Sequence, residues 1–329
     1  MRGLFAGVAG VRRARVEIIP PSARFARLST QELLRAYFAC DDLLYMVRAN
    51  DEVAAIEAEL VDAIVKEFED RFPAAADAAR AAIEEVGLRE LFEEGDLQRV
   101  LEAIEGPLAE GLEKAIAAPV QAAIDGSYLG GRGKILKPFG IEPSFNLTDE
   151  HAQGVLRRDT MYWIGSSYGN HVGPMIADVV RKEVIEQGLS RLDGADRLAE
   201  LFGADFPDRS IHYWRVVSAA AVVRSHTFGN VESFVQAGVR TYILRNPNDA
   251  RTSDVCRYLD GKEFDVSVAV SRRDAFLAAE DPDEAKGAMP WVKKADVDGL
   301  DSSALAAANV ALPPFHGRCR TIVVPKDFG

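Results

Sequence analysis

Two short stretches in the last third of the 329-residue chain carry the residue types best suited to chemistry. Cys256 lies in the first stretch, residues 249–264, while His316 and Cys319 lie in the second, residues 313–325, with the spacing His-x-x-Cys. A thiol beside an imidazole can act as a nucleophile with its general base. A pattern split in this way predicts that two distant segments meet in one small fold.

A metal-dependent reaction is the second chemistry that these residues allow. His316, Cys319 and Asp254 could together hold a hydrolytic metal ion. The alternative to a structural role is therefore a Cys/His-dependent hydrolase. Neither arrangement has an identifiable third orienting group or oxyanion loop, so we expect no catalytic residues and no enzyme.

The polar neighbours of Cys256 are expected to stabilise the fold. Asp249 and Thr252 are predicted to hydrogen-bond local backbone N–H groups and to shape a turn. Arg251 is predicted to form a bidentate ion pair with a carboxylate such as Asp260. Gly261 permits a positive φ.

Strands must hold the two stretches together. Residues 239–245 and 321–324 are rich in β-branched residues and flank the stretches, so we expect two paired strands. Residues 262–266 predict a short hairpin arm after the Asp-Gly turn. Arg320 is expected to cover the strand pair or to meet an acidic partner. Residues 267–312 are polar and acidic, and predict a mobile insertion with one or two short helices.

The chain before the strands is predicted to be helical, which makes the fold class α+β. Helical patterns fill residues 29–125 and 145–237, where Thr148 is the expected cap of one helix and residues 198–202 form a separate short helix. Gly238 is the expected C-cap before the first strand. One apolar face near the start consists of Val53, Ile56, Leu60, Ile64 and Phe68.

Composition limits the class of protein. The net charge of −12 argues against a generally basic nucleic-acid-coating surface. Three cysteines are too few for a disulfide scaffold, so we expect a reducing compartment. No uninterrupted apolar run reaches the roughly eighteen residues of a membrane span, so we expect no membrane partner.

Basic residues gather in two places on this acidic chain. Residues 1–28 are predicted to be a solvated basic arm, and the glycine-rich residues 126–144 a flexible linker. A DNA-binding module is the third hypothesis. The side chains that would contact DNA are Arg12, Arg13, Arg15, Arg132 and Lys134.

A combination of motifs resembles the phage head morphogenesis family, the minor head proteins of phages Mu and SPP1. The resemblance covers about residues 145–325, which makes residues 145–329 the expected head morphogenesis domain. In chain order, the motifs are Phe145-Asn146-Leu147-Thr148, Arg224-x-x-Thr227-Phe228-Gly229-Asn230, Ala237-Gly238-Val239, Asp249-x-Arg251-Thr252-Ser253-Asp254-x-Cys256, Leu259-Asp260-Gly261-Lys262-x-Phe264 and Pro314-x-His316-x-x-Cys319-Arg320.

This resemblance implies a minor capsid protein that acts in head assembly. It implies a component of the virion or prohead, assembled in the bacterial host cytoplasm. Its implied partners are the portal protein and other head proteins, with a role in handling DNA during packaging or ejection.

The resemblance also raises the question of bound zinc. Cysteine-richer members resemble Cys-x-x-Cys followed by His-x-x-Cys-x-Cys, a set that suits zinc, but here Ser253 and Thr321 replace the outer cysteines. Cys256, His316 and Cys319 remain, and Asp254 or Asp249 is the candidate fourth ligand. A Cys256–Cys319 disulfide and a pair of buried thiols are the alternatives, and buried thiols are favoured.

Overall fold

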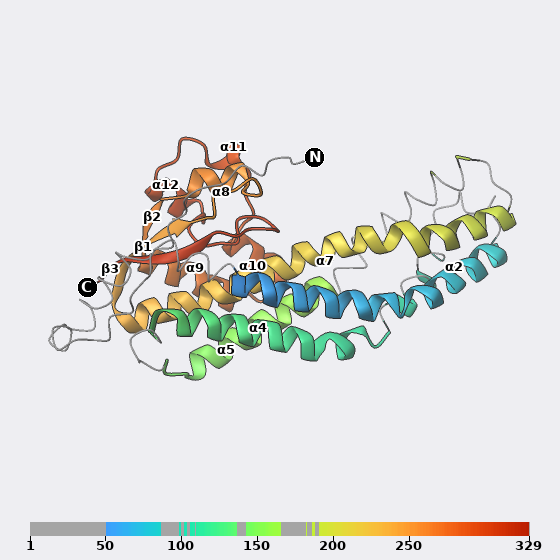
Figure 1. The fold of residues 1–329 in the computed structure, drawn as a ribbon, viewed down its shortest axis with the longest axis horizontal. Helices are drawn as coiled ribbons and strands as arrows, with labels where there is room; N and C mark the ends of the chain where they lie inside the picture. The colour runs from blue at the N-terminus through green and yellow to red at the C-terminus, as the bar shows by residue number, and fades with distance from the viewer. Residues whose placement is uncertain are drawn as a thin grey trace, which may run out of the picture.

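A computed structural model describes residues 51–86, 110–136, 143–165 and 191–328, with isolated positions at 99, 102–103, 106–108, 182 and 186–187. The molecule is elongated, with a helical bundle along its length and a small sheet at one end (Figure 1). The predicted α+β class is confirmed, because the fold is mostly helical with a three-stranded antiparallel sheet in the C-terminal part. None of the described helices is both long and apolar enough to cross a bilayer.

The bundle is assembled from amphipathic helices. Residues 51–69 are helical, and the predicted apolar face is confirmed: Val53, Leu60, Ile64 and Phe68 are buried, and Ile56 packs against the core. Phe68 stacks on Trp214, with a distance of 3.8 Å between the ring centroids. The other bundle helices are α2 (Phe72–Val86), α4 (Leu112–Leu136), α5 (Leu147–Ile164) and α7 (Arg191–Ala237).

Helix α7 is the longest element and continues through a predicted interruption. The separate short helix predicted at residues 198–202 is instead part of one helix of 47 residues. Helices α2, α4 and α5 all pack along α7. This packing offsets the low helix propensity of the glycine and proline residues within α7.

The predicted glycine-rich linker is wrong for residues 126–136, which complete α4. The glycines serve a close helix crossing rather than a loop. A Cβ atom at Gly131 would lie 2.2 Å from the carbonyl oxygen of His226, and one at Gly229 would lie 2.2 Å from that of Tyr128. Only glycine lets the α4 and α7 backbones approach this closely.

Arg132 follows this crossing and is fully enclosed. Its exposed fraction is 1%, and its Nε lies 3.0 Å from Oδ1 of Asp149. Asp149 also accepts a hydrogen bond of 2.8 Å from the hydroxyl of Tyr128. Asp149 is in the first turn of α5, where Asn146, and not the predicted Thr148, caps the helix. The prediction that Arg132 contacts DNA is therefore wrong.

The sheet matches the prediction closely. Strand β1 (Val239–Arg245) is central, between β2 (Glu263–Asp265) and β3 (Ile322–Phe328), and both neighbours are antiparallel to it. Gly238, with a φ of 68°, connects α7 directly to β1. A strand from each chemical stretch thus pairs with the same central strand.

Residues 267–312 contain more helix than the one or two short helices predicted for this insertion. They contain most of α9 (Val266–Ala278), together with α10 (Pro282–Ala288), α11 (Lys294–Val297) and α12 (Ser302–Ala307). Many of their apolar side chains face inward. The buried ones include Phe276, Leu277, Met289, Val297, Leu305 and Val310.

Gly131→Ala should destabilise the fold by about 3 kcal/mol, because the added methyl group collides with backbone atoms of α7 that cannot move independently. Gly126→Ala in the same helix is the matched control, since its Cβ would meet only the Ile56 side chain at 3.9 Å. The control should gain up to about 1 kcal/mol from helix propensity. Urea unfolding followed by circular dichroism measures both changes, and equal stabilities would contradict the close crossing.

Candidate metal and thiol site

Helix α8 and the turn before β3 bring the two chemical stretches together. Ser253 is the N-cap of α8 (Asp254–Leu259), and its side chain accepts a hydrogen bond from the backbone N of Cys256. Across from it, the turn at His316 is closed by a 3.2 Å bond from Cys319 N to His316 O. A Cβ at Gly317 would lie 2.3 Å from Cγ1 of Val216, so this turn is pressed against α7.

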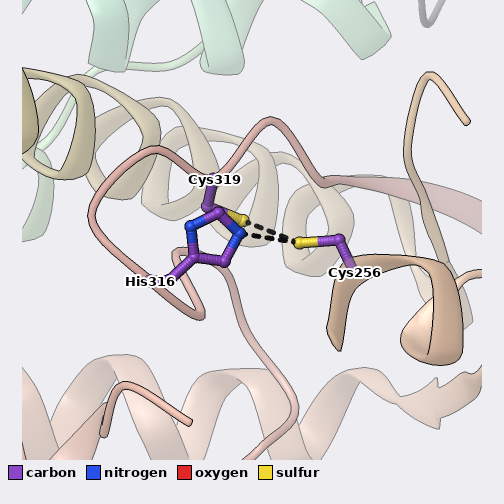
Figure 2. Close-up of side chains that lie close together, drawn as sticks. All are labelled: Cys256, His316 and Cys319. Carbon is purple, nitrogen blue, oxygen red and sulfur yellow. Dashed lines mark hydrogen bonds between the residues drawn. The ribbon is translucent and has the colours of Figure 1, made fainter. Parts of the chain in front are cut away.

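Cys256, His316 and Cys319 point at one another (Figure 2). The Sγ atom of Cys256 lies 3.1 Å from Nε2 of His316 and 3.7 Å from Sγ of Cys319. The donor atoms of all three residues lie within 4.8 Å of one another, so the group could hold a metal ion. Both cysteines are free thiols and buried, while His316 is partly exposed.

The predicted fourth ligand is wrong. Neither Asp254 nor Asp249 belongs to this group. Asp254 is exposed at the start of α8, two residues from Cys256, and residues two apart on a helix do not face the same way. Ser253, three residues before Cys256, does face the group, and its Oγ lies 2.9 Å from Nε2 of His316.

The surroundings favour a charged Cys256. Hydrogen bonds, first from Cys319 and then from His316, Ser253 and Thr321, lower the pKa of the Cys256 thiol, although its burial opposes this. Burial and the neighbouring Cys256 raise the pKa of Cys319. The surroundings therefore favour the thiolate form at Cys256 over the thiolate form at Cys319.

The His316 ring is oriented by its own turn. The backbone N of Arg318 donates to Nδ1 of His316 over 3.3 Å, which assigns the neutral ring's proton to Nε2. That proton points toward Cys256 and Ser253. A metal ion bound through Nε2 would displace this proton. The neutral ring would then carry its proton on Nδ1, which faces the Arg318 N–H group, so metal binding requires a small adjustment of the turn at His316.

Asp249 ties the first stretch to the second. The predicted turn is confirmed: Arg251 N donates to Oδ1 of Asp249, and Asp249 N donates to the Thr252 hydroxyl. The Arg320 guanidinium reaches both carboxylate oxygens of Asp249. Arg320 thus meets an acidic group, but that group is within the chain.

The predicted Arg251–Asp260 ion pair is wrong. Asp260 instead accepts hydrogen bonds from Asn246 N at 3.0 Å and from Nδ2 of Asn248 at 2.9 Å. It therefore fixes the chain just after β1. Gly261 has a φ of 78°, as predicted for the turn into β2.

Arg224 is buried away from the thiol group. Its Nη1 lies 2.9 Å from Oδ2 of Asp159, and its guanidinium lies 4.6 Å from the centre of the Phe276 ring. It lines a mostly apolar pocket of about 570 Å³ with Asp159, Trp163, Lys286 and Trp291. Nothing in the sequence spacing connects Asp159 to Arg224, so sequence reasoning missed both the pair and the pocket.

The other predicted DNA contacts cannot be located. Arg12, Arg13 and Arg15 lie outside the described residues, and so does the side chain of Lys134. Comparisons with protein-family models, with curated proteins and with solved structures find no match to this chain.

Asp249→Asn should lower the melting temperature at pH 7 by about 1–3 °C, because the exposed charge pair with Arg320 is lost while Asn can still accept from Arg251 N. The pairing lowers the pKa of Asp249, so its contribution is full above the unfolded pKa of about 3.9 and fades as the pH falls below it. The difference from wild type should therefore shrink below about pH 4.

Scanning calorimetry between pH 7 and pH 3 measures this difference. Asp62→Asn, at an exposed position in the helical residues 51–69, is the control and should show little effect. A wild-type-to-variant difference that stays constant with pH would contradict the charge pair.

Proposed function

We propose that this chain is a phage minor head protein that associates with the portal during capsid assembly, rather than an enzyme. The observation that carries the proposal is the closure of residues 249–264 onto residues 313–325 through a shared central strand. Those two stretches carry the motifs that resemble the head morphogenesis family. These stretches close into one unit at the end of α7, which fits a compact domain carried by a helical bundle.

The docking surface that we propose for the portal protein lies around the enclosed Arg132. Four large apolar side chains are unusually exposed there: Leu129, Phe145, Leu147 and Val235. Arg132 connects the segments that carry two of them, since it bonds to Ser144 O beside Phe145 and to Gln236 beside Val235. Exposed apolar groups in one place are typical of interaction surfaces.

Leu147→Asp should weaken capture of the portal protein encoded in the same genome by at least about tenfold. The reason is that a charged carboxylate replaces an apolar side chain that is 80% exposed and would contact the portal protein. Co-expression and affinity purification measure the effect. Trp291→Ser, at a 52% exposed position in the C-terminal unit, is the control and should leave capture unchanged. Failure of the wild-type chain to enter proheads would contradict the proposed function itself.

The metal that the site suits best is zinc, and we propose a structural role for it. Two cysteines and one histidine are typical zinc ligands. They come from both stretches, so a bound ion would join them. The fourth position would face Ser253 or Thr321, whose hydroxyls border Cys256.

Ser253→Cys should raise zinc affinity by about 10²-fold, because it supplies a fourth ligand, a third thiolate, from the turn of α8 that already faces the site. Competition with a chromophoric chelator measures the affinity. Ser303→Cys, exposed on α12, controls for an added thiol and should change nothing. Equal zinc affinity in wild type and Ser253→Cys would contradict this assignment of the fourth position.

A thiol-dependent hydrolase is the second candidate, favoured by the 3.1 Å separation of Cys256 Sγ and His316 Nε2. One observation weighs against it: Cys256 is only 2% exposed, so its thiol is poorly accessible to a substrate. Loss of a hydrolytic activity in Cys256→Ala, with head assembly intact, would reverse this preference.

A further inference from the structure

Arginines concentrate around the thiol site of a chain whose net charge is −12. Two are in or beside the loop of Asp249: Arg251 donates its backbone N to that carboxylate, and Arg257 donates to the carbonyl oxygens of Asp249 and Thr252. Arg320 donates to the same carboxylate from the second stretch. The first stretch thus presents cationic side chains on a loop whose backbone is fixed by hydrogen bonds.

The turn at His316 adds Arg318, and α7 adds Arg215. Arg318 follows Gly317, which is pressed against Val216, the neighbour of Arg215. The backbone N of Arg318 is held by His316. Arg215, Arg251 and Arg318 are all exposed, and none of them forms an ion pair within 4 Å with any residue that the structure describes.

These arginines face one carboxylate, Glu57, on the helix of residues 51–69. Burial raises the pKa of Glu57, and Arg318, Arg251, Arg215 and Arg320, in decreasing order, oppose that rise. All four guanidinium groups therefore lie close enough to the Glu57 carboxyl group to favour its charged form. Even with Glu57, Asp249 and the exposed Asp254 counted, the five arginines outnumber the carboxylates.

We propose that Arg215, Arg251 and Arg318 form a binding site for a phosphate group at the rim of the thiol site. Guanidinium groups bind phosphate oxygens through paired, charge-assisted hydrogen bonds, and here they stand on rigid supports. A phosphate group carries more acceptor oxygens and more charge than the single Glu57 carboxylate, so it can engage several arginines at once. The site does not depend on the proposed portal contact or on zinc.

The test measures binding to the full chain of two probes, inorganic phosphate by calorimetry and a fluorescent 20-base-pair DNA duplex by anisotropy. The double variant Arg251→Ala/Arg318→Ala should weaken phosphate binding by at least about tenfold. Glu57→Gln should strengthen it by about threefold or more, because the competing carboxylate is removed. Arg240→Gln, at an exposed position on β1, is the matched control and should bind like wild type.

Glu57→Gln keeps the test independent of folding defects, because a variant that merely loses structure cannot gain affinity. Thermal melts check that the double variant is folded. Phosphate binding without duplex binding assigns the site to free phosphate or a small phosphate ester. Duplex binding that phosphate displaces, with a salt dependence that weakens in the double variant, assigns it to a nucleic-acid backbone.

Three results would overturn the proposal. The first is that neither probe binds wild type at millimolar phosphate and low salt. The second is that the affinity for the probes is the same in wild type, the double variant and Glu57→Gln. The probes would then bind somewhere other than at these residues. Binding of an acidic peptide that phosphate does not displace would also overturn it, in favour of a protein ligand.

Discussion

The central position of β1 is the constraint on which the C-terminal unit depends. Strand β2 begins at the end of the first chemical stretch and β3 begins within the second, and each pairs with one edge of β1. The chain between β2 and β3, which includes α9 to α12, must return to β1 for both pairings to form. The thiol site is a result of that return, because Cys256 and Cys319 are 63 residues apart in sequence and 3.7 Å apart in space.

Local sequence predicts the elements around this constraint well. The β-branched run of residues 239–245 and the Asp-Gly turn before β2 carry their own conformational preferences, so the strands were found at nearly the right residues. The meeting of Cys256 with His316 and Cys319 was predicted too. The fourth ligand was not, because Asp254 and Cys256 point in different directions once α8 forms, and Ser253 has the better position.

Features that depend on contacts between distant segments could not be read from local patterns. Glycine has a poor helix propensity, so the run at residues 130–133 predicted a linker, yet α4 continues through it because Gly131 and Gly229 admit a close crossing. The partner of Arg132 is likewise decided by folding, since Asp149 lies on the next helix. Residues 267–312 are interrupted by charged, Pro and Gly residues, and only the fold reveals that their buried apolar side chains belong to a common core.

Helix α7 reaches from the far end of the bundle to the sheet and passes into β1 through the single residue Gly238 (Figure 1). Its 47 residues correspond to a rod of about 70 Å. Gly317 packs against the same helix at Val216. One continuous helix therefore links the bundle both to the sheet and to the turn that carries His316.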